Sequence, residues 1–526
     1  GSTGFIRAFG PEFRDVALLA GLPHLPSGAF DVSGDVALGW DLLRVKDMTA
    51  SVGSLAGSAS GNVVIRGDNA GGFDLDVMLA GPDLAALPEI EGLENLAGET
   101  FRIAGHLGLR EDILTATDLD VSLGDLNATL NGAVRGAAEH VRISVSANAA
   151  SSRMIQKFAG LGYLPDGPVS AEGGIEKSDN EIRFTEAAAA IGDVRVAANG
   201  SLSLQPRSSD SDLAVSVSGP SLRDAGRIFS VTSLPEKAFE ISGEFSGIPS
   251  GFYVQEFIAR LGDNDLRGEF NVNLEGKPRV AGVLTSTYLD LSRQAGESQA
   301  QVAREEADGS SEPGEGNRRL FSDEPLDTSW LRAADIDLRL QIDELIANTL
   351  HVTDVVVGLE LLDGALRVAP VFLRENNGTI EADFSLVPRE NQYELQTSAT
   401  IEAVHIGMLA PGIEDTATLP PTAGSLRFFG SGNSVRSIMA SLNGQLSVRQ
   451  DAGRVQEVFG SGLFKDVLLQ VLRTLNPTRR ERGFQLLECG IFDISVKDGI
   501  ASIDTFAIQT DSMTTLAWGQ VNLRNE

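Results

Sequence analysis

The sequence predicts an all-β protein, an elongated and curled antiparallel sheet made of repeats of about 70 residues. Glycine is abundant, at 57 of 526 residues, whereas aromatic residues make up only 6% of the chain. This composition is typical of many short strands joined by turns. An alternating apolar strand also returns along the chain, as FDVSGDVAL from Phe30, FRIAGHLGL from Phe101 and FEISGEFSG from Phe239. Composition and recurrence together predict a repeating sheet.

Two sets of glycines establish the repeat. The glycine inside the alternating strand stands at positions 34, 105, 173 and 243, with steps of 71, 68 and 70 residues. A second glycine, in SVGSL, SLGDL, AIGDV and RLGDN, stands at 53, 124, 192 and 262 with the same steps. Short helical segments, PDLAALPEIEG, SSRMIQKFAG and PSLRDAGRIFS, end three of the units. Because a unit of this size cannot close a core alone, we expect neighbouring units to continue one sheet.

The repeat and the changes in composition divide the chain. Residues 1–24 are expected to be the tail of a truncated preceding repeat, and residues 25–294 to hold four β-groove repeats, at about 25–95, 96–163, 164–233 and 234–294. Residues 295–327 are polar and acidic, with Gly, Ser and Pro, which predicts a disordered insert or linker. Residues 328–526 return to alternation and are expected to form a C-terminal β-groove region. Apolar residues at helical spacing predict one amphipathic helix there, over 462–475, which Pro477 stops.

Charge and motifs exclude several classes of function. The net charge is 42 − 73 = −31, so the surface repels phosphate backbones and nucleic acid is not expected as a partner. The five histidines are scattered without metal-binding spacing, and the glycine-rich segments lack the lysine of a phosphate-binding loop. Cys489 lies in an apolar strand and is expected to be a buried thiol, and Asp498-Gly499 predicts a hairpin turn. We therefore expect no catalytic residue, no metal and no cofactor, and interpret the protein as a non-enzyme.

The candidate site is the apolar face of the sheet. Strict alternation gives a sheet one apolar and one polar face, and the sequence offers no second set of strands and too few helices to cover the apolar one. This favours an open, concave groove over an ordinary sandwich core. The side chains expected to line the groove are Phe30, Val32, Val36, Leu38, Phe73, Leu75, Val77, Phe101, Ile103, Leu107, Leu109, Val141, Ile143, Val145, Leu213, Val215, Val217, Phe239, Ile241, Phe245, Ile336, Leu338, Leu340, Ile342, Val355, Val357, Leu359, Phe384, Leu386, Phe492, Ile494 and Val496.

One basic cluster stands out on this acidic chain. Arg473, Arg479, Arg480 and Arg482 lie within and just beyond the predicted helix. Because arginine clusters attract anionic lipid head groups, these four side chains are expected to contact lipid phosphates.

Three segments of the C-terminal half resemble the AsmA family. They are RLFSDEPLDTSWLRAADIDLRLQIDEL at 319–345, GSLRFFGSGNSVRSIMASLNGQLSVRQDAGRV at 424–455, and LLECGIFDISVKDGIASIDTFAIQTD at 486–511. The resemblance is most specific over residues 319–526, and the repeat period extends it in architecture to residues 1–295. This family, the AsmA-like, TamB and YhdP group, is similar to the bridge-like lipid transfer proteins with a repeating β-groove.

The resemblance implies a function in the Gram-negative envelope. It implies a periplasmic protein, fixed to the inner membrane by an anchor expected to be missing from this fragment, with the outer membrane or an outer-membrane protein as its other partner. The groove would carry phospholipid acyl chains between the two membranes and so support outer-membrane homeostasis. Two alternatives stay open at this point. One is an assembly factor for outer-membrane proteins that acts by β-augmentation, and the other is a structural tether of the envelope.

Overall fold

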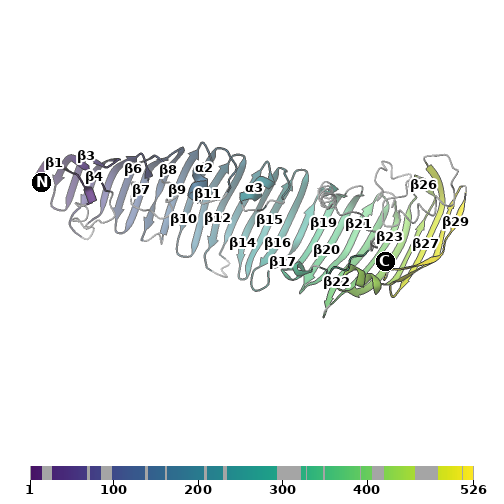
Figure 1. Ribbon diagram of the computed structural model, residues 1–526. Coiled ribbons are helices and arrows are strands. Elements are labelled where there is room, and N and C mark those ends of the chain that lie inside the picture. Colours follow the sequence, from purple (N-terminus) through teal and green to yellow (C-terminus); the bar gives the residue numbers. More distant parts are fainter. Residues whose placement is uncertain are drawn as a thin grey trace, which may run out of the picture. The chain divides into compact units, whose positions relative to one another are not determined.

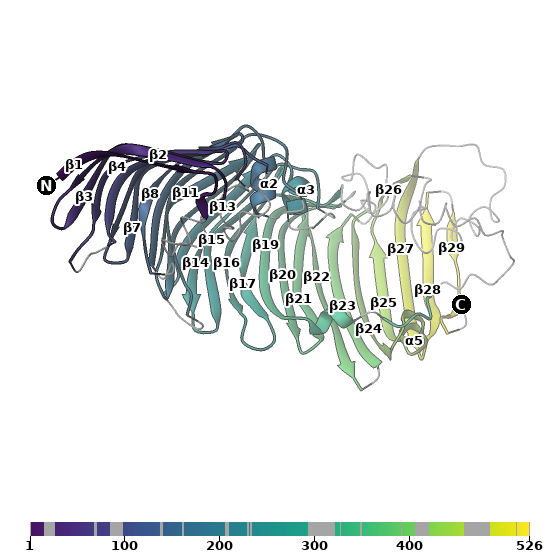
Figure 2. The same ribbon diagram turned by 60° about the vertical axis from the view of Figure 1, so that its left-hand side comes forward.

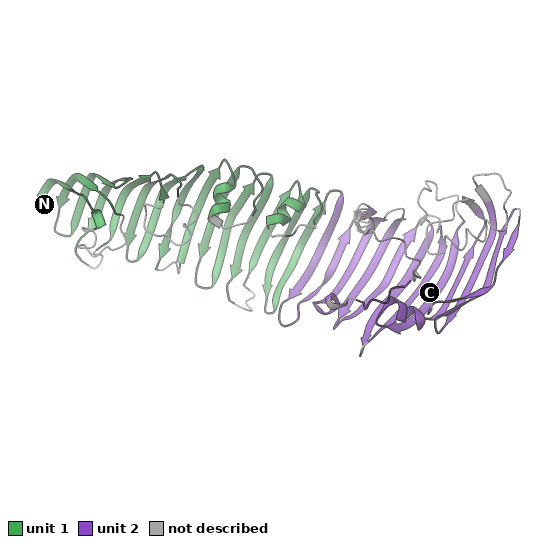
Figure 3. Ribbon diagram, viewed as in Figure 1, with its two compact units in different colours: residues 1–262 green, residues 263–526 purple. Residues whose placement is uncertain are grey.

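The structure, a computed structural model, describes residues 2–14, 27–67, 71–84, 98–136, 140–159, 163–205, 210–228, 231, 234–292, 321–326, 328–347, 350–390, 392–405, 420–456, 484–511 and 513–524. Nearly all regular structure in these ranges is β-strand, which confirms the predicted all-β class (Figure 1). The chain divides into two compact units, residues 1–262 and 263–526 (Figure 3).

Unit 1 is an antiparallel sheet in which each strand pairs with the next strand along the chain. Its strands are β1 (Ser2–Gly10), β2 (Phe30–Leu38), β3 (Leu42–Val52), β4 (Leu55–Val64), β5 (Phe73–Gly81), β6 (Phe101–Arg110), β7 (Ile113–Leu123), β8 (Leu126–Arg135), β9 (His140–Ala149), β10 (Val169–Lys177), β11 (Glu181–Ile191), β12 (Val194–Ser203), β13 (Asp212–Gly219), β14 (Phe239–Ile248) and β15 (Gly251–Leu261). The helices α2 (Arg153–Ala159) and α3 (Leu222–Ile228) follow β9 and β13. Each of the three repeats that lie wholly within unit 1 therefore contributes four strands, and in two of them a short helix is described after the last strand.

The second set of repeated glycines forms a tight turn. Gly53, Gly124, Gly192 and Gly262 adopt left-handed φ angles of 57°, 57°, 58° and 61°, which other residues rarely adopt without strain. Each donates its backbone N–H to the carbonyl just before the first strand of its own repeat, on Ala29, Thr100, Pro168 and Ala238 respectively, at 2.8 or 2.9 Å. The turn thus joins two strand ends that are about twenty residues apart in sequence.

The first set of repeated glycines, at positions 34, 105, 173 and 243, lies opposite a β-bulge. In the second strand of each repeat one acidic residue adopts a positive φ and adds a residue to the ladder, and these residues are Asp47, Asp118, Glu186 and Glu256. A Cβ built on Gly173 would lie 2.5 Å from the Cα of Ala187, next to one such bulge. At Gly34, Gly105 and Gly173 the bulged backbone therefore occupies the space of a side chain, whereas at Gly243 the nearest atom is a side-chain carbon of Val254 at 3.1 Å.

Unit 2 is also a sheet (Figure 2), and five of its strands are 12 to 14 residues long, against 8 to 11 residues in unit 1. Its strands are β16 (Asn264–Asn273), β17 (Arg279–Ser286), β18 (Leu289–Asp290), β19 (Asp335–Ala347), β20 (Leu350–Leu362), β21 (Ala365–Glu375), β22 (Gly378–Arg389), β23 (Gln392–Val404), β24 (Thr422–Gly432), β25 (Asn443–Gln450), β26 (Gly453–Gln456), β27 (Phe484–Lys497), β28 (Ile500–Thr510), β29 (Thr514–Leu516) and β30 (Gly519–Asn522). A 3₁₀ helix, η3 (Ser329–Arg332), precedes β19, and α5 (Val435–Ala440) follows β24.

One pairing in unit 2 departs from the predicted antiparallel order. β17 and β18 pair with β19 in parallel, whereas the remaining pairs described in this unit are antiparallel. Parallel neighbours require the connecting chain to return to the edge where the first strand began. Residues 321–326 and 328–334 lie on that return, since the N–H of Leu326 donates to the carbonyl of Asn433 and the Thr328 hydroxyl bonds to the Tyr393 hydroxyl, at 2.8 and 2.5 Å.

The buried core of unit 1 lies along one edge of its sheet. We call this edge, where odd-numbered strands end and α2 and α3 lie, the helix rim, and the opposite edge the turn rim (Figure 1). One hydrophobic cluster at the helix rim consists of Leu55, Leu84, Phe101, Leu123 and Met154. Met154 belongs to α2 and Leu84 to the connection after β5, so the segments between repeats cover the ends of the strands and leave their middles uncovered.

We expect Gly173→Ala to destabilise unit 1 by about 1–3 kcal/mol, because a methyl group would collide with the bulge at a φ of +127°. Gly174→Ala is the matched control, since a Cβ at that neighbouring position meets nothing closer than 3.5 Å. Urea unfolding followed by circular dichroism compares the two variants. Equal midpoints would show that the bulge does not need the glycine.

Candidate functional site

The strand register of unit 1 collects the predicted groove residues on one face. Directly paired residues of an antiparallel ladder point to the same side of the sheet. Leu75 pairs with Leu107, Ile143 with Ile175, and Leu213 with Phe245. Following the pairs from β2 to β14 places all twenty groove residues predicted in unit 1 on this face. We call it the apolar face of unit 1.

The apolar face consists of uninterrupted rows that cross the strands. A row is the set of paired residues met when passing from strand to strand. The row through Ile103 consists of Val32, Ala50, Gly57, Leu79, Ile103, Val121, Ala128, Ala147, Ala171, Ala189, Val196, Val217, Ile241 and Ala259. No member of this row carries a hydrogen-bonding side chain, and many members are small. The row is therefore a smooth apolar lane that runs perpendicular to the strands.

Solvent exposure shows that described parts of the chain leave this face open. Ile175, Val196 and Ile241 point from the apolar face yet are 42%, 42% and 38% exposed. A second sheet or a helix layer over the face would bury such side chains. The described residues of unit 1 thus form a single layer, as the sequence predicted.

Unit 2 repeats the arrangement. The pairs from β19 to β28 bring all twelve predicted groove residues of this unit to one face, beginning with Leu340 opposite Val357 and ending with Ile494 opposite Ile503. Ile342, Val352, Val355 and Val404 form its buried cluster, at the edge where β19 ends. The twelve predicted groove residues of this face are half-buried or buried, whereas Val521 at the end of the sheet is exposed.

The opposite face of unit 1 is polar and carries cross-strand ion pairs. Arg142 lies 2.5 Å from Glu176, and His106 lies 2.8 Å from Asp74 and 3.0 Å from Asp76. All of these groups are exposed, so each pair contributes little stability. Their effect is to keep this face hydrated while the other face stays apolar.

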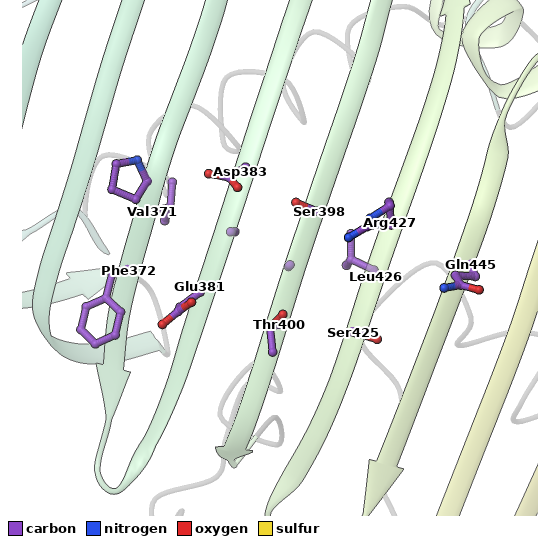
Figure 4. Close-up of a pocket in the computed structure, with 13 residues that line it drawn as sticks. Val371, Phe372, Glu381, Asp383, Ser398, Thr400, Ser425, Leu426, Arg427 and Gln445 are labelled. Atoms are coloured by element: carbon purple, nitrogen blue, oxygen red, sulfur yellow. The ribbon is translucent and has the colours of Figure 1, made fainter.

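Two hollows open on the polar face of unit 2, where the sequence had predicted none. One has a volume of about 530 Å³ and is lined by side chains that include Phe372, Glu381, Asp383 and Arg427 (Figure 4). Its neighbour, of about 760 Å³, shares Asp383 and Arg427. Both lie beside the extra residue that β21 carries in its ladders with β20 and β22, and a bulge bends its strand. The proline inside RVAPVFL was the available sequence signal, because proline within a strand marks such irregularities.

Other sequence predictions have mixed outcomes. Asp498-Gly499 forms the predicted hairpin turn, with positive φ at both residues. Cys489 is exposed, so the prediction of a buried thiol is wrong. The ladder between β27 and β28 shifts after Leu487, which pairs Cys489 with Gln509 on the polar side. The predicted helix at 462–475 and the four arginines at 473–482 lie outside the described residues.

The described ranges lack two kinds of feature. No group of three or more His, Cys, Asp or Glu side chains there is arranged to hold a metal ion. No described helix is long and apolar enough to cross a membrane. The expectations of no cofactor and no catalytic residue remain predictions.

The fold and its apolar face define a class of protein, a repeating β-sheet with one layer and one open apolar side. Comparison with known proteins agrees with this class, since the AsmA family model matches residues 257–503. The AsmA family protein YhjG of Escherichia coli (strain K12) is 24% identical over 353 residues, which cover 64% of this chain and 50% of that protein. Residues 257–503 are therefore an AsmA family region, and the family resemblance predicted from the sequence is confirmed.

The chain spans about half the length of the curated relative that it matches. No solved structure matches the chain.

We expect Asp76→Asn to lower the pKa of His106 towards its ordinary value of about 6.5. The hydrogen bond that the His106 imidazole donates to the Asp76 carboxylate raises that pKa, helped by the charges of Asp74 and Asp76 and opposed by partial burial. A raised pKa in the folded state means that protonated His106 stabilises the fold at low pH, and that this contribution is lost as the pH rises through the folded-state pKa. An NMR titration of the imidazole measures the shift. Asp31→Asn, which removes a distant exposed carboxylate, should leave His106 unchanged.

Proposed function

We propose that this chain binds phospholipids by their acyl chains along its apolar face and conducts them between the two membranes of a Gram-negative envelope. The single observation that carries the proposal is the open row through Ile103, Val196 and Ile241, which is apolar on every strand from β2 to β15. A long apolar surface on a chain of net charge −31 needs an apolar ligand, because water solvates it poorly.

The dimensions of the face suit an acyl chain. Residues on one face of a strand are two positions apart, which is about 6.6 Å, and neighbouring strands lie about 4.8 Å apart. The space between two neighbouring rows is therefore about as wide as a hydrocarbon chain, and it is as long as the sheet. Each methylene removed from water gains about 0.8 kcal/mol, so a chain of ordinary length is held firmly.

The same face favours movement along the sheet. Small and medium apolar side chains recur in each row, and the row through Ile103 carries no hydrogen-bonding side chain that would fix a ligand at one strand. An acyl chain that shifts by one strand exchanges one apolar neighbour for another at little cost. Direction must then come from the membranes or proteins at the two ends, because the sequence contains no phosphate-binding loop for a nucleotide.

We base the proposed location and partners on the family resemblance. An AsmA family region supports a place in the cell envelope, and we propose the periplasm, with attachment to the inner membrane and delivery to the outer membrane or a protein in it. The basic cluster at residues 473–482 stays a proposed contact for lipid phosphates.

Lipid analysis tests the proposal directly. We expect native mass spectrometry of the purified chain to show several phospholipids per molecule. The triple variant Ile175→Asp, Val196→Asp and Ile241→Asp should lose most of them, because two of the charges enter the row through Ile103 and the third enters the same apolar face two rows away. These three side chains are already exposed, so we expect the variant to stay folded by circular dichroism.

The matched control adds the same three charges to the other face. Thr185→Asp, Ala197→Asp and Ser216→Asp change exposed residues of the polar face on neighbouring strands and should keep the bound lipid. A folded wild-type chain without lipid would reject the proposal and favour a structural tether. A bound unfolded polypeptide in place of lipid would favour the assembly factor.

A further inference from the structure

The two rims of unit 1 differ in how far the apolar side chains beside them are buried. The buried apolar residues of this unit gather at the helix rim, among them Phe30, Phe101, Val169, Val194 and Phe239, which are all less than 10% exposed. The turn rim has the opposite character. Leu38, Leu114 and Leu202 lie at that edge and are between 42% and 49% exposed.

Described contacts explain why the helix rim is closed. A Cβ built on Gly124 would lie 2.5 Å from the terminal methyl group of Met154, so α2 sits directly on that turn. Lys157 of the same helix forms an ion pair with Glu99 at 2.7 Å, and the N–H of Leu84 donates to the Glu99 carbonyl. These contacts fix two inter-repeat segments over the end of the apolar face. An acyl chain or its head group could leave there only if this packing opened.

The turns of the turn rim also carry exposed charged side chains. Strands β6, β8 and β10 end there in Arg110, Arg135 and Lys177, which are exposed. Lys177 pairs with Val141 and lies on the apolar face, whereas Arg135 and Arg110, which forms an ion pair with Asp74, lie on the polar face. Exposed carboxylates at Asp112 and Asp179 follow in the adjoining turns. Cations suit the phosphate of a lipid, and the neighbouring carboxylates suit an amine on the same head group.

We propose that lipids in unit 1 lie with their acyl chains on the apolar face and their phosphate-bearing head groups over the turn rim. The inference rests on the proposed lipid-binding function and adds an orientation to it. The groove of this unit is thus one-sided: the helix rim is its closed wall and the turn rim is its opening. Lipids that move along the sheet keep their head groups on the same side throughout.

Cross-linking from the head group tests the orientation. In a Cys489→Ser background, Asp179→Cys and Asp193→Cys place a single thiol at opposite ends of β11, one at each rim, and both parent residues are exposed aspartates. The chains are incubated with phosphatidylcholine vesicles that contain phosphatidylethanolamine carrying a maleimide on its head group. We expect Asp179→Cys to react at least about fivefold more than Asp193→Cys, because bound lipid raises the local maleimide concentration at the turn rim.

Controls separate the possible failures. Soluble N-ethylmaleimide should label both thiols equally, which excludes a difference in reactivity. The triple variant Ile175→Asp, Val196→Asp and Ile241→Asp should abolish the lipid cross-link at residue 179. Equal cross-linking at the two rims, none at either while lipid is bound, or a cross-link that survives the triple variant would overturn the orientation and leave lipid binding intact. A chain that binds no lipid by mass spectrometry would instead overturn the proposed function itself.

Discussion

The register between neighbouring strands is the constraint on which the rest of this structure depends. A slip by one residue would turn every apolar side chain of a strand to the polar face. A sheet of one layer has no second layer to hold the register, so the chain fixes it locally in every repeat. The glycine turns at Gly53, Gly124 and Gly192 fix one end of each hairpin, and the bulges at Asp47, Asp118 and Glu186 fix its middle. These devices recur with the sequence period because each new repeat must be aligned again.

The apolar face was largely predictable from the sequence, and its interruptions were not. Alternation in first and fourth strands such as β6 and β9 placed Ile103 and Val145 correctly, because those strands keep a strict period of two. In β3 the apolar residues pass from Val45 to Met48, since the bulge adds a residue between them. A rule of strict alternation cannot follow that shift. The same reasoning explains the error at Cys489, where another register shift moved the thiol to the polar face.

Features that depend on contacts between distant parts of the chain could also not be predicted from the sequence pattern. The parallel pairing of β17 with β19 has the same alternation as an antiparallel pair, so Leu284 opposite Leu340 carries no local signal of direction. The closed helix rim depends on Met154 meeting Phe101 and Leu123 across some fifty and thirty residues of sequence. Composition showed that helices were too few to cover the apolar face, but only the packing shows which edge they cover.

A single layer that stays open also has an energetic consequence. The helix rim provides unit 1 with buried side chains such as Phe101, whereas Val196 and Ile241 remain 42% and 38% exposed. Any apolar ligand on those rows binds the folded sheet and not the unfolded chain, so it stabilises the fold by an amount that grows with the logarithm of its concentration above the Kd. Stability and cargo are therefore coupled through the same side chains. The charges of the triple variant would remove this coupling without touching the rim core. Its unfolding midpoint should thus stop responding to added phospholipid, while the polar-face control should still respond.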